Sequence, residues 1–405
     1  MSAISDPPAE SFRLSQLIYD SRYRSITIQA VAAILILAGV VWLVNNTVQN
    51  LSALGKDFDF GFLWQRAGYD INQRLIEYSN DSPHARAALV GILNTLLVAL
   101  LGCITATILG VIAGVLRLSK NWIVGRLMTV YVEGFRNIPL LLWIIVIFAV
   151  MTEATPQPRE FRGEDPSASM ILFDSVAITN RGIYIPGLDW GPGSLVLIAV
   201  FIASLVGIYL FRSYARKRQE ATGDILPVFW VSLALFVIPS LIFYFILGRP
   251  VTLNYPQLQG FNFQGGTHLR NSLIALWVAL SLYTGAFIAE IVRAGILAVS
   301  HGQTEAASAL GLRPNRTMNL VVLPQALRVI IPPLISQYLN LTKNSSLAIA
   351  VGYMDVRATL GGITINQTGR ELEGMLLLGL FYLITSLAIA GVMNLYNASV
   401  KLQER

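Results

Sequence analysis

Long uncharged stretches, separated by short charged segments, dominate the pattern of hydrophobic and polar positions along this chain. A helix needs roughly 20 mainly apolar residues to cross the hydrocarbon core of a bilayer. Five intervals between charged residues enclose a long enough uncharged run: Arg24 to Lys56, Arg86 to Arg117, Asp189 to Arg212, Asp224 to Arg249 and Glu373 to Lys401. Three further runs, at 130–152, 268–298 and 327–352, are mainly apolar but carry a few charges. The pattern therefore predicts eight membrane-spanning helices.

The basic residues predict how these helices are oriented. An even number of spans places both termini on one side of the membrane. The short segment between the fourth and fifth spans, Arg212–Arg218, has four basic residues in seven, and such segments are typical of cytoplasmic loops. We therefore predict that both termini are cytoplasmic. The first apolar run lies too far into the chain and is too long for a cleaved signal peptide, so it is expected to stay as an anchor.

Composition agrees with a protein surrounded by membrane lipids. Hydrophobic residues make up 54% of the 405 residues and charged residues only 13%, whereas about a quarter of a soluble domain is charged. The predicted fold class is an all-α polytopic bundle. The net charge of +6 comes with no dense basic cluster among stacking aromatics, which argues against nucleic acid as a partner. The three histidines lie in separate loops without metal-ligand spacing, so we expect no metal site. The single cysteine, Cys103, is expected to be a small buried hydrophobe.

The segment after the sixth predicted span is the most informative one. Gln303–Leu310 is rich in good helix formers, with Gly302 before it and Gly311 at the position where a left-handed turn favours glycine. Pro314 then prevents the helix from continuing. The small residues of this predicted helix would let another protein approach closely, so the helix is suited to docking into a partner protein. The alternative is a re-entry loop packed on its own helix ends, and the residues alone leave both open.

Four motifs, in the right order, resemble those of bacterial ABC importer permeases of the polar amino acid (histidine/glutamine-type) subfamily. Glu305-Ala306-Ala307, Gly311 and Leu323-Pro324 resemble the EAA loop, and Leu282–Ile296 resembles the helix before it. Tyr131–Leu141 resembles an earlier motif, although Asn137-Ile138 replaces the usual Gly-Thr. Lys343–Leu347 resembles a Lys-Asp-Thr-Ser-Leu stretch.

The resemblance implies a domain organisation around a type I ABC importer permease core. The expected parts are a cytoplasmic tail (1–25), an extra first helix with a periplasmic loop (26–87), the two core parts (88–152 and 268–400), an insertion with two extra helices (153–267) and the coupling loop (293–326). Such an enlarged chain is similar to the larger permease of broad-specificity L-amino-acid transporters, in which two different permeases pair.

The resemblance also implies a mechanism and partners. A periplasmic amino-acid-binding protein would deliver the substrate. A second permease subunit and two ATP-binding subunits, which bind ATP and Mg, would complete the importer. The complex would lie in the inner membrane and work by alternating access. The chain itself has no expected cofactor or catalytic residue, since Gly55-Lys56 is followed by Asp57 and lacks the phosphate-cradling pattern. Glu305, Ala306, Ala307 and Gly311, with Leu323 and Pro324, would contact or position the ATPase. Alternatively, Glu305 simply favours the positive end of its helix dipole.

Charged residues inside predicted spans are candidates for the substrate pathway because they are costly there. Glu133 and Arg136 are spaced to pair on one helix, as a neutralised pair or as a gate, with Pro139 as a kink just beyond. Pro332 and Pro333 are expected to interrupt the helix that carries the polar cluster Lys343, Asn344, Ser345 and Ser346. This cluster would meet a zwitterion, or else Lys343 reaches an interface and the serines bind neighbouring helices. Asn94 is either a polar contact for substrate or a link between helices.

One other class of transporter is also compatible with part of the sequence pattern. An ion-coupled secondary amino-acid transporter would also show polar residues in broken helices. It would have no reason for the exposed small-residue helix, and no internal repeat is visible in the sequence.

Overall fold

The computed structural model describes residues 16–53, 55, 58–163 and 165–400. Residues 1–15 of the predicted tail therefore lie outside the described part. The α-helices are α1 (Gln16–Tyr19), α2 (Ser21–Ala53), α3 (His84–Leu116), α4 (Trp122–Asn137), α5 (Leu140–Glu153), α6 (Ser194–Thr222), α7 (Val228–Ile246), α8 (Asn271–Leu297), α9 (His301–Ala309), α10 (Pro314–Thr317), α11 (Leu323–Asn344), α12 (Val356–Ala358), α13 (Ile365–Thr368) and α14 (Glu371–Val400). Short 3₁₀ or π segments are η1 (Gly61–Trp64), η2 (Pro158–Phe161), η3 (Met318–Val322), η4 (Ser345–Val351) and η5 (Thr359–Thr364).

Eight helical segments in the described part are long and apolar enough to cross a membrane, as the sequence predicted. They are Tyr23–Ala53, His84–Leu116, Leu140–Phe161, Ser194–Thr222, Val228–Ile246, Asn271–Leu297, Pro314–Val351 and Glu371–Ala398. The all-α polytopic fold class is thereby confirmed, and two of the predicted spans need new boundaries.

The third span begins later than predicted. The expected run at 130–152 is split, because α4 ends at Asn137 and α5 begins at Leu140. Ile138 is extended, with φ −107° and ψ 134°, as a residue before proline usually is. Pro139 thus ends a helix instead of kinking one. Glu133 and Arg136 consequently lie on α4 and outside the candidate span, so placing these charges inside a span was wrong.

The seventh span is one long helical run with a local irregularity. Residues 314–344 are continuously helical through α10, η3 and α11, and η3 is a π-helix. Pro324 has no N–H to donate to the preceding turn, and a π turn just before it accommodates the missing bond. Pro332 and Pro333 remain inside α11. The expectation that these two prolines interrupt the helix was therefore wrong.

The core is centred on the pair α3 and α8, which cross through small residues. Ala106, Gly110 and Gly114 follow one another at every fourth position of α3 and face Gly285 and Ala289 of α8. A Cβ added to Gly110 would lie 2.5 Å from the Ile288 Cβ and 2.9 Å from the Gly285 carbonyl oxygen. Such small-residue stripes let helix backbones approach closely where no hydrophobic effect drives association. Residues of α5 and α11 complete the same hydrophobic cluster.

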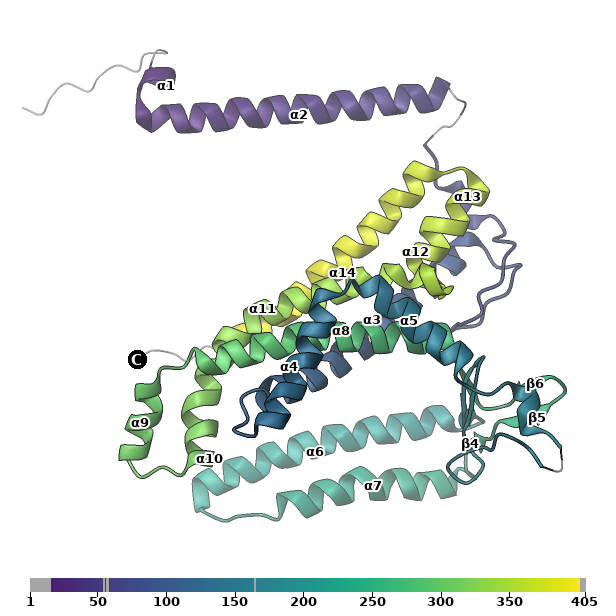
Figure 1. Cartoon of the computed structure of the whole chain (residues 1–405), viewed down its shortest axis with the longest axis vertical. Helices are drawn as coiled ribbons and strands as arrows, with labels where there is room; N and C mark the ends of the chain where they lie inside the picture. The colour runs from purple at the N-terminus through teal and green to yellow at the C-terminus, as the bar shows by residue number, and fades with distance from the viewer. Residues whose placement is uncertain (1–15, 54, 56–57, 164, 401–405) are drawn as a thin grey trace, which may run out of the picture.

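The other apolar helices have little protein around them. Trp42 and most other apolar side chains of α2 are exposed, and Figure 1 shows α2, with the short α1 beside its start, apart from the bundle formed by the later helices. Helices α6 and α7 pack on each other as a hairpin, with outward-facing apolar side chains such as Phe229 and Ile246. Exposed apolar surface of this kind is what a helix in lipid presents.

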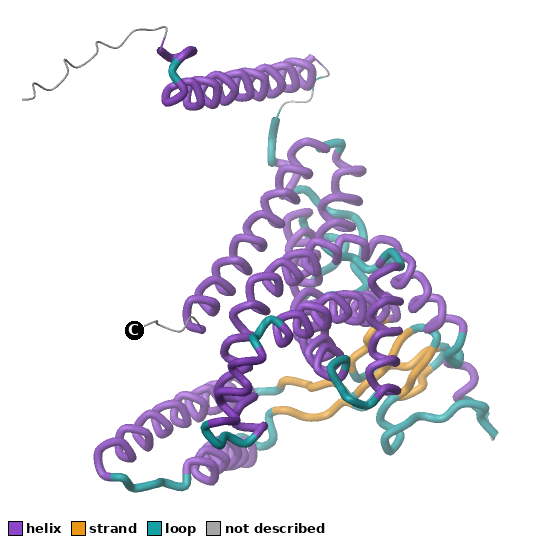
Figure 2. Tube along the Cα trace, turned by 60° about the vertical axis from the view of Figure 1, so that its left-hand side comes forward, coloured by secondary structure: helices purple, strands orange, loops and turns teal. Residues whose placement is uncertain are grey.

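Seven short strands, counted over the described residues, form at one end of the bundle and were not predicted from the sequence. They are β1 (Ala177–Thr179), β2 (Gly182–Ile185), β3 (Gly187–Trp190), β4 (Val251–Asn254), β5 (Gln257–Gln259), β6 (Asn262–Gln264) and β7 (Thr267–Arg270). The order β1-β2-β7 and the pair β3-β4 are antiparallel, with Tyr184 opposite His268. The loop before α6 and the loop after α7 therefore form one small β unit, which Figure 2 shows beside the helix ends.

Candidate functional site: helix α9 and the ion pairs at the end of α8

Helix α9 follows α8 directly and exposes most of its side chains. Glu305, Ala306 and Leu310 are exposed, and only Ala307 is buried, at 3%. The helix contacts η3 and α10, and Figure 1 shows it beyond the end of α8. Gln303 accepts a hydrogen bond from Gln325 Nε2 at 3.3 Å, which links α9 to the start of α11. Helix α9 is thus supported on one face and open on the other.

The end of α9 has the geometry that the sequence predicted. Gly311 has φ +75°, its N–H donates to the Ser308 carbonyl, and the Leu312 N–H donates to the Ala307 carbonyl. These bonds satisfy carbonyls that the end of the helix leaves open. The left-handed turn at Gly311 is confirmed. The helix itself begins at His301, two residues before the predicted start, and Glu305 Oε1 lies 3.0 Å from His301 Nδ1.

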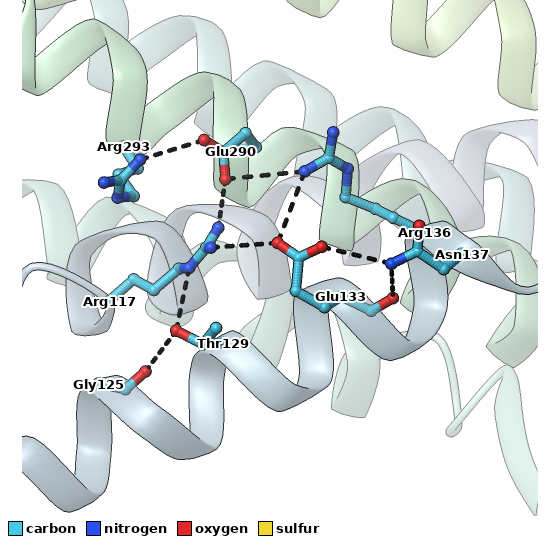
Figure 3. Close-up of polar contacts among 8 residues, drawn as sticks. All are labelled: Arg117, Gly125, Thr129, Glu133, Arg136, Asn137, Glu290 and Arg293. Atoms are coloured by element: carbon cyan, nitrogen blue, oxygen red, sulfur yellow. Dashed lines mark hydrogen bonds and ion pairs between the residues drawn. The ribbon is translucent and has the colours of Figure 1, made fainter.

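Close to α9, the inner ends of α3, α4 and α8 are joined by charged side chains. We call Arg117, Glu133, Arg136, Glu290 and Arg293 the inner ion network (Figure 3). Arg117, only 11% exposed, pairs with Glu290 and lies 3.3 Å from Glu133. Arg136 lies 3.8 Å from Glu290, and Arg293 lies 3.2 Å from it. The two carboxylates therefore hold three helices together.

Neutral side chains fix the orientation of this network. Arg117 Nε donates to Thr129 Oγ1 at 3.3 Å, and that hydroxyl donates to the Gly125 carbonyl at 2.8 Å. Asn137 Nδ2 donates to the Glu133 carbonyl oxygen and carboxylate. The Arg136 guanidinium also lies 5.4 Å from the centre of the Phe287 ring, within the range of a cation–π contact.

The network differs from the simple pair that the sequence suggested. Glu133 and Arg136 do approach each other, but at 4.0 Å, the limit of an ion pair. Their shorter contacts run to other helices. Arg117 was missed because its partner Glu290 is 173 residues away, and no local spacing signals such a contact.

The remaining predicted site residues lie elsewhere and do not gather into one cluster. Lys343 is exposed and has no hydrogen bond or ion pair with any described residue. Ser345 is buried and donates to the Thr342 carbonyl, while Asn344 and Ser346 are half-buried. These residues therefore belong to the junction of α11 and η4, away from the inner ion network.

Asn94 is fully buried and links α3 to two loops. Its Nδ2 donates to the Gln73 carbonyl at 2.7 Å and to the Met354 carbonyl at 2.9 Å. Tyr353 in turn donates to the Asn94 carbonyl at 3.0 Å. Asn94 thus joins α3 to the loop before it and to the residues after η4, and not directly to another helix. Among the described residues, no group of three or more His, Cys, Asp or Glu side chains is placed to hold a metal.

The described part of the chain combines eight candidate membrane helices with an exposed small-residue helix, α9, between two of them. A family model for the inner membrane component of binding-protein-dependent transport systems matches residues 222–402. The glutamate/glutamine/aspartate/asparagine transport system permease protein BztB of Rhodobacter capsulatus is 59% identical over 100% of both chains. The general L-amino acid transport system permease protein AapQ of Rhizobium johnstonii is 45% identical over 98% of this chain and 96% of its own.

A third relative, the putative amino-acid ABC transporter permease protein YhdX of Escherichia coli, is 42% identical over 94% of this chain and 95% of its own. The chain therefore belongs to the family of amino-acid ABC transport permeases. A crystal structure of an amino acid ABC transporter with histidines shares 17% identity and a TM-score of 0.44, over 78% of this chain and 95% of that one.

Family membership confirms the resemblance seen in the sequence. The chain is a multi-pass inner-membrane protein and an amino-acid ABC importer permease. This result supports the importer over the ion-coupled secondary transporter.

Proposed function

We propose that this permease moves polar L-amino acids from the periplasm to the cytoplasm by alternating access, with ATP hydrolysed by separate subunits. The relative with 59% identity is named for glutamate, glutamine, aspartate and asparagine, and we assign these four amino acids to this chain as substrates. The observation that carries the proposal is helix α9, whose open face presents Glu305 and Ala306 to the cytoplasm on the predicted orientation.

In this proposal α9 docks into an ATP-binding subunit, which holds ATP and Mg. Glu305 and Ala306 form the contact, since their side chains are exposed. Ala307 seats the helix against its own chain, because only 3% of it is exposed. Gly311, Leu323 and Pro324 set the position of α9, through the left-handed turn and the π turn before α11. A small, stiff helix that is closed at its end can transmit a displacement without bending.

The inner ion network carries that displacement to the membrane helices. Glu290 and Arg293 lie on α8, close to its junction with α9. Arg117 and Glu133 extend the contact to α3 and α4. A movement of α9 is thereby shared among three helices, and we assign Glu133 and Arg136 to the inner gate of the substrate pathway.

The partners in this proposal are a second permease chain, two ATP-binding subunits and a periplasmic amino-acid-binding protein. Exposed Lys343, with Asn344, Ser345 and Ser346, is assigned to the pathway between the two permeases, and Pro139 to the bend where α4 meets α5. The insertion 153–267 would lie outside the minimal core, with its β unit at the periplasmic face and α6 and α7 in lipid.

The experiment is import of radiolabelled glutamate into liposomes that hold the permease, its co-purified subunits and internal ATP, with binding protein added outside. We expect ATP-dependent import, which Glu305→Lys reduces at least tenfold together with recovery of the ATPase in a pull-down. Glu220→Lys is the matched control, because Glu220 is also an exposed acid on the predicted cytoplasmic side. Import by the chain alone on an ion gradient would contradict the proposal.

A further inference from the structure

A cavity of about 210 Å³, lined mostly by polar residues, lies at the outer end of α8, opposite the inner ion network. Its wall comes from the loop before α3, the end of α5, the turn between β1 and β2, the start of α8 and the residues after η4. This volume is below the roughly 300–1,000 Å³ of pockets for drug-sized ligands and suits a smaller metabolite. The core and the insertion thus build one cavity together.

Three amide oxygens among the lining residues have no hydrogen-bond partner although they are buried. They are Gln73 Oε1, Asn180 Oδ1 and Asn271 Oδ1. Asn271 is only 4% exposed, and its Nδ2 donates to the Asn180 carbonyl at 2.7 Å. This bond orients the Asn271 amide, so that Oδ1 is the atom left without a hydrogen-bond partner. A buried acceptor without a donor is costly. All three residues line the same cavity, where a ligand that donates several hydrogen bonds would supply the missing partners.

The same cavity offers groups that attract an anion. Arg181 and Arg270 line it, and its lining includes no aspartate or glutamate among the described residues. Arg270 has no hydrogen bond or ion pair with any described side chain or carbonyl, whereas Arg181 donates from one nitrogen to the Phe261 carbonyl. The first turn of α8 has no side-chain cap, so its N–H groups also favour a negative charge.

We propose that this cavity is an outer binding site for a zwitterionic amino acid. The α-ammonium group donates to the amide oxygens of Gln73, Asn180 and Asn271, and the α-carboxylate accepts from Arg270. The site rests on the proposed function, since it would receive substrate on the periplasmic side before the substrate enters the bundle. It assigns the insertion a direct part in substrate recognition.

The insertion is held firmly enough to serve as one wall. Asn180 and Arg181 form the two-residue turn of the β1–β2 hairpin, and β2 pairs with β7, which leads directly into α8. The Asn180 N–H donates to the Pro156 carbonyl at 2.9 Å. Asn180 is therefore bonded to two separate segments, the loop after α5 and the start of α8. Asn94 supports the opposite wall through its bonds to Gln73 and Met354.

The test is protection of a cysteine in the cavity. Thr152 lines the cavity without a role in the proposed contacts, so Thr152→Cys in a Cys103→Ser background reports access of a membrane-impermeant thiol reagent. The assay uses the complete transporter without binding protein. We expect L-glutamate to slow modification about tenfold, in line with hydrogen bonds to charged groups. Glutarate, which lacks the ammonium group, and L-isoglutamine, which lacks the α-carboxylate, should not protect.

Two variants sharpen the result. Arg270→Gln should abolish protection, whereas Arg249→Gln, at an exposed arginine near the outer end of α7, should keep it. Equal modification with and without glutamate, in a preparation that imports glutamate with ATP and binding protein, would overturn the outer site and leave the proposed function standing. Equal protection by glutarate would reduce the site to a simple anion site and also overturn it. Protection without ATP-dependent import would instead overturn the proposed function.

Discussion

The two ends of α8 differ in how their polar groups are satisfied. At the inner end, every charged side chain of the inner ion network takes part in at least one ion pair, and Arg136 Nε is the one buried network atom without a partner. At the outer end, Asn271 and two neighbouring amides keep an oxygen without a partner, and Arg270 is unpaired among the described residues. Charged groups that are paired with one another hold helices in one arrangement, whereas polar groups without a partner are suited to binding a ligand. The inner end is thus suited to transferring motion, and the outer end to recognising a ligand.

The small-residue seam between α3 and α8 joins these two ends, and breaking it should have the largest effect. Gly110→Val places side-chain atoms where the Ile288 Cβ and the Gly285 carbonyl already lie. Overpacking usually lowers the free energy of unfolding by about 1–3 kcal/mol. The rigid backbone of α8 opposite Gly110 should place the loss for this variant at the upper end of that range. We expect little monodisperse protein on size-exclusion chromatography. Gly379→Val is the control, because a Cβ added there would meet no heavy atom within 4 Å beyond its own stretch of helix. Equal yields of the two variants would show that the seam is not close-packed.

Removing the central carboxylate should break the inner end selectively. Glu290→Gln leaves Arg117, Arg136 and Arg293 facing one another without their shared partner. Hydrogen bonds to charged groups are worth about 1.5–3 kcal/mol each, and partial exposure of Glu290, at 30%, reduces the loss to about 2 kcal/mol. We expect a lower melting temperature and loss of import, with glutamate protection at the outer cavity retained. Glu220→Gln, the control, removes an exposed ion pair on α6 and should change neither the melting temperature nor import. Loss of glutamate protection in Glu290→Gln would show that the two ends of α8 are not separable.

At the outer end, a buried carboxyl should make stability depend on pH. Asp355 caps α12, with Oδ1 accepting from the Ala358 N–H and Oδ2 unpartnered. Burial raises its pKa from 3.8 to about 7, against the opposing effect of backbone N–H groups and Arg357. The folded protein therefore keeps this proton to higher pH than the unfolded chain, so the free energy of unfolding falls as pH rises from about 4 to about 7 and then levels off.

Asp355→Asn should remove this pH dependence, because asparagine also caps a helix but does not titrate. The measurement is the melting temperature of both proteins between pH 5.5 and 8. We expect the wild-type value to decline across this range relative to that of the variant. Parallel curves would show that Asp355 is already ionised at the lowest pH.

Much of the membrane architecture could be predicted from the sequence because a bilayer imposes a length. Five uncharged runs and three mainly apolar runs with a few charges predicted the eight spans, and Gly311 with Pro314 marked the end of α9. The predicted start of the third span was wrong because Pro139 can either bend a helix or end one, and only the surrounding structure decides. The strands were missed because each has three or four residues, too few to show alternation.

Contacts between distant residues could not be predicted. The i,i+3 spacing indicated a Glu133–Arg136 pair, but the shorter bonds of this network come from Arg117 and Glu290, which are 173 residues apart. The outer cavity likewise brings Gln73, Asn180 and Asn271 together from three separate segments. Their burial, and not their residue type, distinguishes them from ordinary polar loop residues.

The smallest expected effect concerns the edge of the inner ion network. Arg293 makes one ion pair, to Glu290 at 3.2 Å on the same helix, and is 37% exposed. Pairs of this kind contribute about 0.3–0.5 kcal/mol, so Arg293→Gln should lower the melting temperature by about a degree or less and leave import nearly unchanged. Arg117→Gln is the matched comparison, because Arg117 is 11% exposed and bridges three helices. If Arg293→Gln were as damaging as Arg117→Gln, the network would act through the α8–α9 junction and not by joining α3, α4 and α8.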